Sequence, residues 1–290
     1  MKAARFAYHS PQSVDEAIGL LRQFGDEGKV LAGGQSLIPL LALRLARFEN
    51  LVDLRRAAGL TGITQEDGEV RIGAMTTHTA VHRSEILATA VPLLPRAAAF
   101  VGHPAIRNRG TIGGALAHAD PAAEFPAVAL ALDAELEVAG PAGTRRVPAR
   151  SFFISTYISA LESDEVLVAV RFPTWTGDCG FAVKEYARRR GDYAMAGVVC
   201  AVQLRDERIE RSSIAFIGLG GTPVRAAAAE VLITGTAPGD LDLAEVARAA
   251  VEGLEAADDM HVTARQRTRM AQALVRHALD DAIAEAAGHG

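Results

Sequence analysis

The chain has only two cysteines, Cys179 and Cys200, among its 290 residues. Two thiols cannot ligate an iron–sulfur cluster, which takes about four ligands, and a disulfide is not expected in a reducing compartment. No apolar run reaches the roughly 20 residues that a membrane-spanning helix needs, and the first residues lack the apolar core of a secretory signal. We therefore expect a cytoplasmic protein without a membrane span, in which both cysteines are buried free thiols.

A basic excess is absent as well. The chain has 30 Lys and Arg residues against 35 Asp and Glu residues, a net charge of −5, whereas nucleic-acid binders usually carry a basic face. Hydrophobic residues make up 49% of the sequence, which is typical of a soluble globular protein with a large core. The length suits about two domains, and no nucleic-acid partner is expected.

Two glycine pairs, Gly33-Gly34 and Gly113-Gly114, are the most informative feature that the sequence does contain. Each follows a segment predicted to be extended and precedes an apolar stretch. Because glycine has no Cβ, neighbouring N–H groups can turn toward one point, and a concave row of such donors can hold an anion. Two rows would suit a diphosphate. The spacing differs from G-x-G-x-x-G, so the ordinary dinucleotide-binding fold is not indicated.

Short polar side chains accompany both pairs: Gln35, Ser36, Thr111, His118, Asp120 and Glu124. A glycine pair alone is weak evidence for a ligand, because such pairs are common in ordinary turns. The polar neighbours make a ligand site more plausible than the pairs alone do. Bare backbone combined with a few polar groups is what a phosphate or ribityl site needs. His118 and Asp120 alone are too few ligands for a metal, and we expect no metal site.

The pattern of apolar residues predicts an α+β chain with a boundary at Pro173–Gly180, where proline and glycine interrupt the periodicity. Before it we expect a helix over Ser13–Phe24 and a hairpin over Gly62–Met75 that turns at Asp67-Gly68. The other strands expected there are Arg5–Tyr8, Lys29–Ala32, Asn50–Asp53, Ala134–Ala139, Arg145–Val147 and Glu165–Phe172. The other helices are Leu37–Leu45, a short helix that Thr76 or Thr77 caps and that ends at His82, Pro92–Phe100 and Ala122–Leu132. Beyond it we expect strands at Phe181–Tyr186, Ala194–Leu204 and Ser213–Leu219, followed by helices at Ala226–Ile233, Leu241–Leu254 and Ala264–Ala286.

Several motifs occur in the order found in the medium flavoprotein subunit of molybdenum hydroxylases, the family of the carbon monoxide dehydrogenase medium subunit and the xanthine dehydrogenase FAD domain. A-G-G-Q-S at Ala32–Ser36 and T-I-G-G at Thr111–Gly114 resemble its two FAD loops. Leu116–Ala127, Phe181–Ala194 and Phe216–Ala226 are also similar to family motifs. The resemblance therefore covers essentially the whole chain.

The resemblance implies a two-subdomain FAD-binding fold of the vanillyl-alcohol oxidase/PCMH type over residues 1–177, with a subdomain boundary near 55–60. A smaller α+β domain, an antiparallel sheet with helices, would follow over residues 178–290. FAD would lie extended between the subdomains. The first loop places no His or Cys for a covalent flavin bond, so we expect noncovalent FAD.

The resemblance also assigns the cofactor positions, and no residue of this chain is expected to be catalytic. The two loops would hold the diphosphate and ribityl, Val166 and Leu167 would pack near the flavin or adenine, and Lys184 and Tyr193 would lie near the isoalloxazine. Ala115 stands where relatives often have Asp or Asn, so only its backbone N–H could serve. The expected cofactor-binding residues are Ala32, Gly33, Gly34, Gln35, Ser36, Thr111, Ile112, Gly113, Gly114, Ala115, His118, Glu124, Val166, Leu167, Lys184 and Tyr193.

By the same resemblance, the chain is the FAD-carrying electron-transfer subunit of a three-part hydroxylase. A large molybdenum-cofactor subunit would oxidise the substrate, and a small subunit with [2Fe–2S] clusters would pass electrons to this flavin. The acceptor would be a quinone, NAD⁺, oxygen or another carrier. Two alternatives stay open: a self-sufficient FAD-dependent oxidoreductase on the same fold, and a scaffold subunit without flavin, which the intact glycine pairs disfavour.

Overall fold

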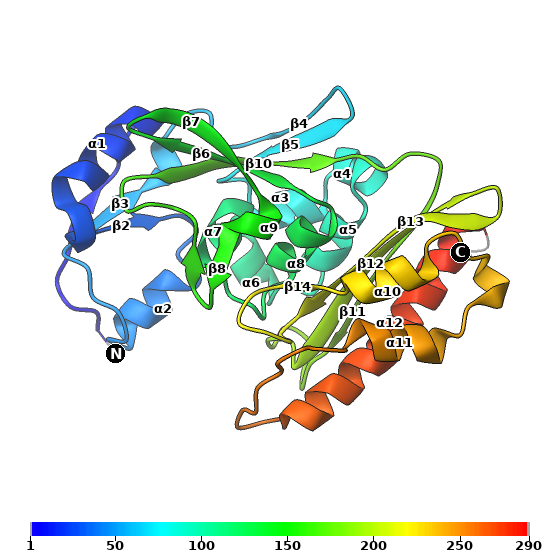
Figure 1. Ribbon diagram of the computed structural model, residues 1–290. Helices are drawn as coiled ribbons and strands as arrows, with labels where there is room; N and C mark the ends of the chain where they lie inside the picture. Colours follow the sequence, from blue (N-terminus) through cyan, green and yellow to red (C-terminus); the bar gives the residue numbers. More distant parts are fainter. Residues whose placement is uncertain (1, 289–290) are drawn as a thin grey trace.

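The computed structural model describes residues 2–288. A small parallel sheet forms its N-terminal end (Figure 1), in the order β1-β3-β2. The elements here are β1 (Ala7–His9), α1 (Val14–Phe24), β2 (Gly28–Leu31), α2 (Leu37–Ala42) and β3 (Asn50–Asp53). The Ser13 side chain accepts from the Glu16 N–H and so caps α1, as its sequence pattern predicts. Strand β2 is therefore an edge strand, and the segment after it leaves the sheet at this edge.

A five-stranded antiparallel sheet follows, in the order β4-β5-β10-β6-β7. Its strands are β4 (Ile63–Glu66), β5 (Glu69–Gly73), β6 (Glu135–Gly140), β7 (Gly143–Pro148) and β10 (Val166–Pro173). The predicted β4–β5 hairpin is present, and its turn residues Asp67 and Gly68 have φ angles of 43° and 82°. Two positive φ values are typical of the type I′ turn, which matches the twist of the strands.

Short helices fill the space between this sheet and the C-terminal part of the chain. They are α3 (His78–His82), α4 (Glu85–Ala90), α5 (Leu93–Ala98), α6 (Pro104–Arg107), α7 (Ile112–His118), α8 (Glu124–Ala131) and α9 (Ala149–Phe152), and the hairpin of β8 (Phe153–Ser155) and β9 (Ile158–Ser159) follows them. Every residue of α8 after Glu124 is buried. Because a helix that is apolar all round belongs to an interior, α8 forms the centre of the molecule.

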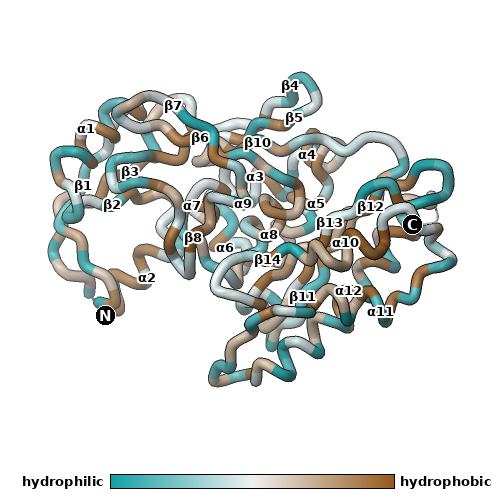
Figure 2. The backbone as a smooth tube through the Cα atoms, viewed as in Figure 1, coloured by the Kyte–Doolittle hydropathy of each residue, from teal (hydrophilic) through white to brown (hydrophobic). Residues whose placement is uncertain are grey.

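The C-terminal part contains an antiparallel sheet, whose strands have the order β11-β12-β13-β14, and three helices. Its elements are β11 (Asp178–Tyr186), β12 (Ala196–Arg205), β13 (Arg208–Ile217), β14 (Val224–Arg225), α10 (Ala227–Ile233), α11 (Leu243–Ala250) and α12 (Ala264–Ala286). Along β12, Val198 and Cys200 pack with the helices, whereas Val199 and Ala201 pack with the core of the N-terminal part. Figure 2 shows the hydrophobic residues of these strands in brown. The sheet is covered on both faces.

The α+β class and the two-part organisation agree with the sequence analysis. The predicted strands and helices are all present; Asn50–Asp53 and Ala264–Ala286 have the predicted ends, and the others are shifted. The sequence analysis missed α4, α6, α7, α9, β8, β9 and β14. It expected a loop at Gly113-Gly114, but Thr111 caps a helix there by accepting from the Gly114 N–H. The limits 1–177 and 178–290 stay our proposed domain limits.

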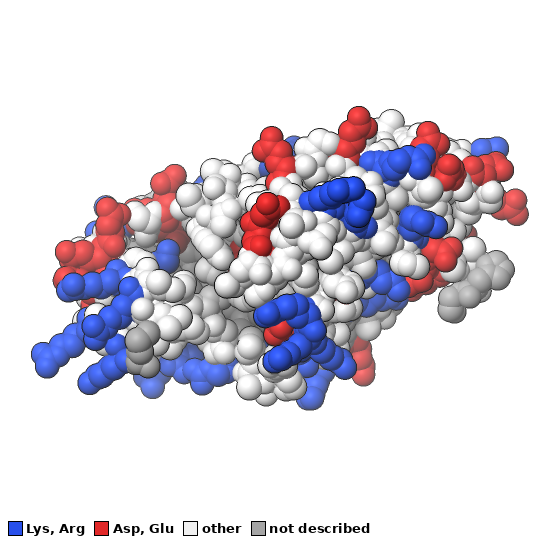
Figure 3. Space-filling model, turned by 90° about the horizontal axis from the view of Figure 1, so that it is seen from below, with Lys and Arg blue, Asp and Glu red and all other residues white. Residues whose placement is uncertain are grey.

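Charged side chains of both signs are spread over the face drawn in Figure 3. Cys179 is partly buried and Cys200 is buried, and both thiols are free. Within residues 2–288, no helix is long and apolar enough to cross a membrane.

Candidate cofactor site

The two glycine motifs lie directly against each other. A Cβ added to Gly33 would overlap the carbonyl oxygen of Arg109 and would lie 2.7 Å from the Cα of Gly110. A Cβ added to Gly114 would lie 3.2 Å from the Cβ of Ala32. The segments are far apart in sequence, and their packing depends on the missing side chain of Gly33.

The first motif presents a row of free donors, the 33–36 loop (Gly33, Gly34, Gln35 and Ser36). Within the described residues, none of these four backbone N–H groups donates to a protein acceptor. Gly34 has a φ of 74°, and the Gln35 side-chain amide donates to the Gly33 carbonyl at 3.1 Å, which supports the turn. Partly buried backbone donors need a partner, and successive N–H groups in a turn can bind an anion.

The second motif has no comparable row. Four successive backbone N–H groups have protein acceptors: Ile112 donates to Thr76 O (3.0 Å), Gly113 to Ala74 O (2.9 Å), Gly114 to Thr111 Oγ1 (3.1 Å) and Ala115 to Thr111 O (3.0 Å). This corrects the expectation of a second set of open donors, including the backbone N–H of Ala115. A Cβ on Gly113 would lie 2.7 Å from the Cα of Ala74. The second motif therefore packs against Ala74 and Thr76, just after β5. We call residues 109–114 the wall, because they form a side of the site without a row of open donors.

His78 supports this wall from behind. Its backbone N–H donates to the Gly110 carbonyl at 2.9 Å, and its ring lies 5.0 Å from that of Phe125. The residue is 5% exposed, and neither ring nitrogen has a hydrogen-bond partner among the described residues. Burial lowers the pKa of His78 to about 4, so the ring is neutral at pH 7. The sequence analysis gave this residue no role, and no signal in one sequence marks it.

Tyr193, on the loop between β11 and β12, reaches across to the N-terminal part of the chain. Its surroundings raise the pKa of Tyr193, first through burial and then through the charges of Asp120, Tyr157 and Glu124, while a hydrogen bond with Ser36 opposes the rise. The residue is still 65% exposed, because it stands at the open side of this group. The C-terminal domain thus contributes a side chain beside the 33–36 loop.

Two carboxyl groups, of Glu124 and Glu185, lie near each other, and the charge of Glu124 also acts on Tyr193. Glu124 begins α8, and Glu185 stands on β11 on the sheet face that packs toward α8. Burial, reinforced by the charge of Glu185, raises the pKa of Glu124 to about 8. Burial raises the pKa of Glu185 to about 7, and its Oε2 atom is buried without a hydrogen-bond partner among the described residues. At neutral pH this pair therefore holds at least part of a proton.

His118 and Tyr157 form the adjoining side. Their rings lie 4.9 Å apart, and the Tyr157 N–H donates to the Ala119 carbonyl at 3.1 Å. Burial lowers the pKa of His118, while the charge of Asp120 opposes that effect. Sequence reasoning placed His118 and Glu124 in the site but missed Tyr157 and Glu185, whose positions depend on tertiary contacts.

The structure does not bring every expected residue to this group. The Lys184 ammonium pairs with Asp281 of α12, on the sheet face opposite to Glu185, so we leave it out of the proposed site. Val166 and Leu167 are buried at the start of β10, where the pairing with β6 shifts register. Leu167 belongs to the large core cluster, and Val166 to the cluster that α1 and β3 form, so both side chains make apolar contacts.

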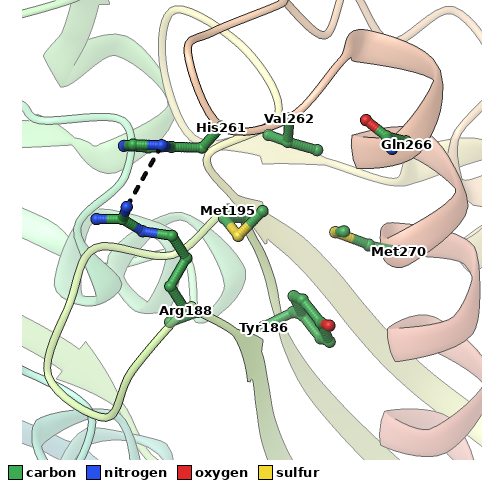
Figure 4. A pocket seen from close by; sticks show the side chains of 8 residues that line it. Tyr186, Arg188, Met195, His261, Val262, Gln266 and Met270 are labelled. Carbon is green, nitrogen blue, oxygen red and sulfur yellow. Dashed lines mark hydrogen bonds between the residues drawn. The ribbon is translucent and has the colours of Figure 1, made fainter.

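A shallow pocket of about 390 Å³ lies elsewhere, at the base of the Tyr193 loop (Figure 4). Met195 and Met270 are among its lining residues, and an Arg188 guanidinium nitrogen approaches Nδ1 of His261 at 3.5 Å. The residues of both glycine motifs are absent from its lining. We therefore do not identify this pocket with the cofactor site.

The carboxyl pair predicts a pH dependence of stability. Both side chains titrate near 4.5 when unfolded, but near 8 and 7 in the folded chain. Because the folded state keeps protons that the unfolded state releases, the stabilisation is complete below pH 4.5 and is lost as the pH rises through 7 to 8. Urea unfolding of the flavin-free chain should therefore give a free energy that falls over this range. Glu185→Gln should reduce the slope; an unchanged slope would argue against the pair.

Comparison with known proteins agrees with this geometry. Residues 4–175 match the FAD binding domain in molybdopterin dehydrogenase, and residues 181–282 match the CO dehydrogenase flavoprotein C-terminal domain. The chain is 39% identical to the 6-hydroxypseudooxynicotine dehydrogenase complex subunit alpha of Paenarthrobacter nicotinovorans, over 98% of this chain and 96% of that protein. It is 38% identical to the carbon monoxide dehydrogenase medium chain of Hydrogenophaga pseudoflava, over 98% and 99% of the two chains.

A solved structure gives the same result. The carbon monoxide dehydrogenase from Hydrogenophaga pseudoflava that lacks the Mo-pyranopterin moiety of the molybdenum cofactor contains a chain that matches with a TM-score of 0.96. The identity is 40%, and the match covers 98% of this chain and 99% of that one. The chain therefore belongs to the FAD-binding medium subunits of the molybdenum hydroxylases, a family of oxidoreductase subunits.

Proposed function

We propose that the 33–36 loop binds the diphosphate of FAD. The observation that carries this proposal is the row of four backbone N–H groups without protein acceptors. The wall at Gly110 and Gly113 would close the other side, with the Thr111 hydroxyl fixed by its capping bond to Gly114. Two anionic phosphates would supply the acceptors that these donors lack.

The flavin ring would lie beside Tyr193, with Ser36 and the Glu124–Glu185 pair around it. FAD, when bound, supplies a redox centre that exchanges electrons one or two at a time, while the protein supplies position and electrostatics. Tyr193 would cover the open side of the ring. The carboxyl pair would hold a proton close to it, because burial raises the pKa of both Glu124 and Glu185.

We further propose that the chain is the electron-transfer subunit of a molybdenum hydroxylase complex. The relatives reported above are named as a medium chain and as a subunit of a dehydrogenase complex. By analogy, a small [2Fe–2S] subunit would donate electrons, a large molybdenum-cofactor subunit would oxidise the substrate, and a quinone, NAD⁺ or oxygen would accept the electrons.

Visible absorbance tests this function. The chain purified with its two partner subunits should show flavin bands that bleach when the substrate of the large subunit is added, and the chain alone should keep them. Bleaching of the isolated chain by an organic substrate would instead identify a self-sufficient oxidoreductase. A colourless chain that does not take up added FAD would identify a scaffold subunit.

Tyr193→Ala should change the reactivity of the bound flavin without removing it, because Tyr193 is exposed at the edge of the site and not part of the donor row. We expect roughly a tenfold change in the rate of flavin reoxidation. Tyr186→Ala is the matched control, since Tyr186 is also exposed and lies at the other end of the same loop. Equal rates for both variants and the wild type would remove Tyr193 from the site.

A further inference from the structure

An ion pair joins the N-terminal part of the chain to the C-terminal part. Arg96 stands in α5, and Glu285 stands in the last turn of α12. Their side chains meet in two parallel hydrogen bonds: Nη1 of Arg96 lies 2.7 Å from Oε2 of Glu285, and Nη2 lies 2.6 Å from Oε1. Such a bidentate pair fixes orientation as well as distance. We call this pair the clasp.

The clasp also binds the backbone of an edge strand. Within the described residues, β11 is hydrogen-bonded in its sheet only to β12. At Phe181 of β11, the Glu285 carboxylate accepts from the backbone N–H at 2.9 Å, and the Arg96 guanidinium donates to the carbonyl oxygen. Backbone groups at a sheet edge need partners from outside the sheet. The clasp therefore satisfies both groups of Phe181 and ties β11 to α5 and α12.

The same strand carries side chains of the proposed site. Phe181, Val183 and Glu185 are alternate residues of β11, whose register with β12 is unbroken, so they point to one face of the sheet. Phe181 and Val183 pack with the core of the N-terminal part, and Glu185 points the same way, toward Glu124. Strand β11 then runs into the loop that carries Tyr193. The position of β11 therefore decides where Glu185 and this loop lie.

The clasp is charged at neutral pH and partly open to water. Hydrogen bonds from Arg96 lower the pKa of Glu285, burial opposes them, and the Phe181 N–H adds to the lowering. The side chains of Arg96 and Glu285 are 40% and 34% exposed. An ion pair this exposed contributes little to stability by itself. Substitutions in the clasp should therefore leave the fold intact, and its main effect is to orient β11.

We propose that Arg96 and Glu285 are positioning residues of the cofactor site, which act by clamping β11. In this arrangement the clasp holds Glu185 against α8, and it holds the Tyr193 loop beside the 33–36 loop. The inference rests on the proposed function, because it takes the identity of the site from there. The positioning itself is a property of the flavin-free chain and can be measured without the cofactor.

The titration of Glu185 in the flavin-free full chain, followed by NMR of its carboxyl carbon, tests the clasp. Burial raises the pKa of Glu185 to about 7, and the charged groups that act on its neighbour Glu124 are Glu185 itself and Asp120. In Arg96→Gln and in Glu285→Gln we expect the midpoint to fall by roughly one pH unit or more, because water reaches a displaced carboxyl. Direct charge effects would have opposite signs in the two variants, since one loses a cation and the other an anion. A fall in both therefore reports displacement.

Asp133→Asn is the matched control. Asp133 follows α8 and pairs with Arg225 at 2.6 Å and with Arg211 at 3.4 Å, so it also joins the two parts of the chain, but at β13 and β14. Asparagine tolerates its φ of 53°. This variant should keep the wild-type midpoint of Glu185, whatever its melting temperature.

The outcomes separate the clasp from the proposed function. Unchanged midpoints in both clasp variants, shifts of opposite sign, or an equal fall in Asp133→Asn would each overturn the positioning role. If a neutral variant does not fold, Arg96→Lys decides, because lysine keeps the charge but not the planar fork, and its midpoint should fall too. A wild-type chain that takes up no FAD would overturn the proposed function and leave the titration result standing.

Discussion

Gly33→Ala is expected to weaken FAD binding by at least about 100-fold, which corresponds to ~3 kcal/mol. The new methyl group would overlap the Arg109 carbonyl and would lie 2.8 Å from its carbon atom. Both obstacles are backbone atoms, which cannot rotate away as a flexible side chain can. The 33–36 loop would therefore move away from Arg109 and Gly110, and its four N–H groups would leave the position in which we propose that they bind the diphosphate. The measurement is a titration of the flavin-free chain with FAD.

Gly19→Ala is the matched control for this substitution. Gly19 lies within α1, and no heavy atom is within 4 Å of an added Cβ there. Alanine in a helix is favoured over glycine by about 1 kcal/mol, so this variant should bind FAD normally and melt slightly higher. Unchanged FAD affinity in Gly33→Ala would show that the close contact between the two motifs does not shape the site.

Gly180→Ala is expected to have the largest effect on stability. Gly180 lies in β11 beneath α12, where an added Cβ would overlap the Ala282 carbonyl oxygen and lie 2.7 Å from the Ala286 nitrogen. Separating the helix from the sheet would break the packing that buries Val275, Ala278 and Ala282. We expect a loss of about 3 kcal/mol, the upper end of the usual cost of overpacking a core, because the obstacles are backbone atoms, and a fall in melting temperature of roughly 6 °C or more.

Gly239→Ala is the control for Gly180→Ala, because it lies in the same domain with nothing within 4 Å of an added Cβ. It should melt close to the wild type. A Gly180→Ala chain with the wild-type melting temperature would mean that α12 does not pack on β11 as closely as described.

Both glycine pairs could be identified from the sequence, but their different roles could not. The two segments look alike as strings of residues, since both combine Gly-Gly with short polar side chains. What distinguishes them is the acceptor of each N–H group: the Gly113 N–H donates to the carbonyl of Ala74, which lies far away along the chain, whereas the Gly33 N–H has no acceptor among residues 2–288. That difference depends on the tertiary structure.

Lys184 shows a second limit of prediction from the sequence, namely which face of a sheet a residue occupies. Strand β11 was predicted, but alternate residues of a strand point to opposite faces, and the sequence did not reveal which face α12 covers. The pairing of Lys184 with Val198 places it on the helix side, and Glu185 consequently points toward α8. A shift of one residue would have exchanged the two side chains.

The start of β13 illustrates why element ends are hard to predict. The β12–β13 turn uses Asp206 and Glu207 at φ angles of 50° and 59°. Such a turn usually contains Asn-Gly or Asp-Gly, and without glycine its sequence gives no clear turn signal. In contrast, Asp67-Gly68 carried that signal, and the hairpin there was predicted correctly.

Amide hydrogen exchange, measured residue by residue with and without FAD, tests the central claim most directly. The account predicts that FAD slows exchange of the four N–H groups of the 33–36 loop by roughly tenfold or more, because the diphosphate becomes their acceptor. The N–H groups of Ile112 and Gly113 should be slow in both states, since they already donate to Thr76 and Ala74. FAD binding that leaves the 33–36 loop unchanged would contradict the account.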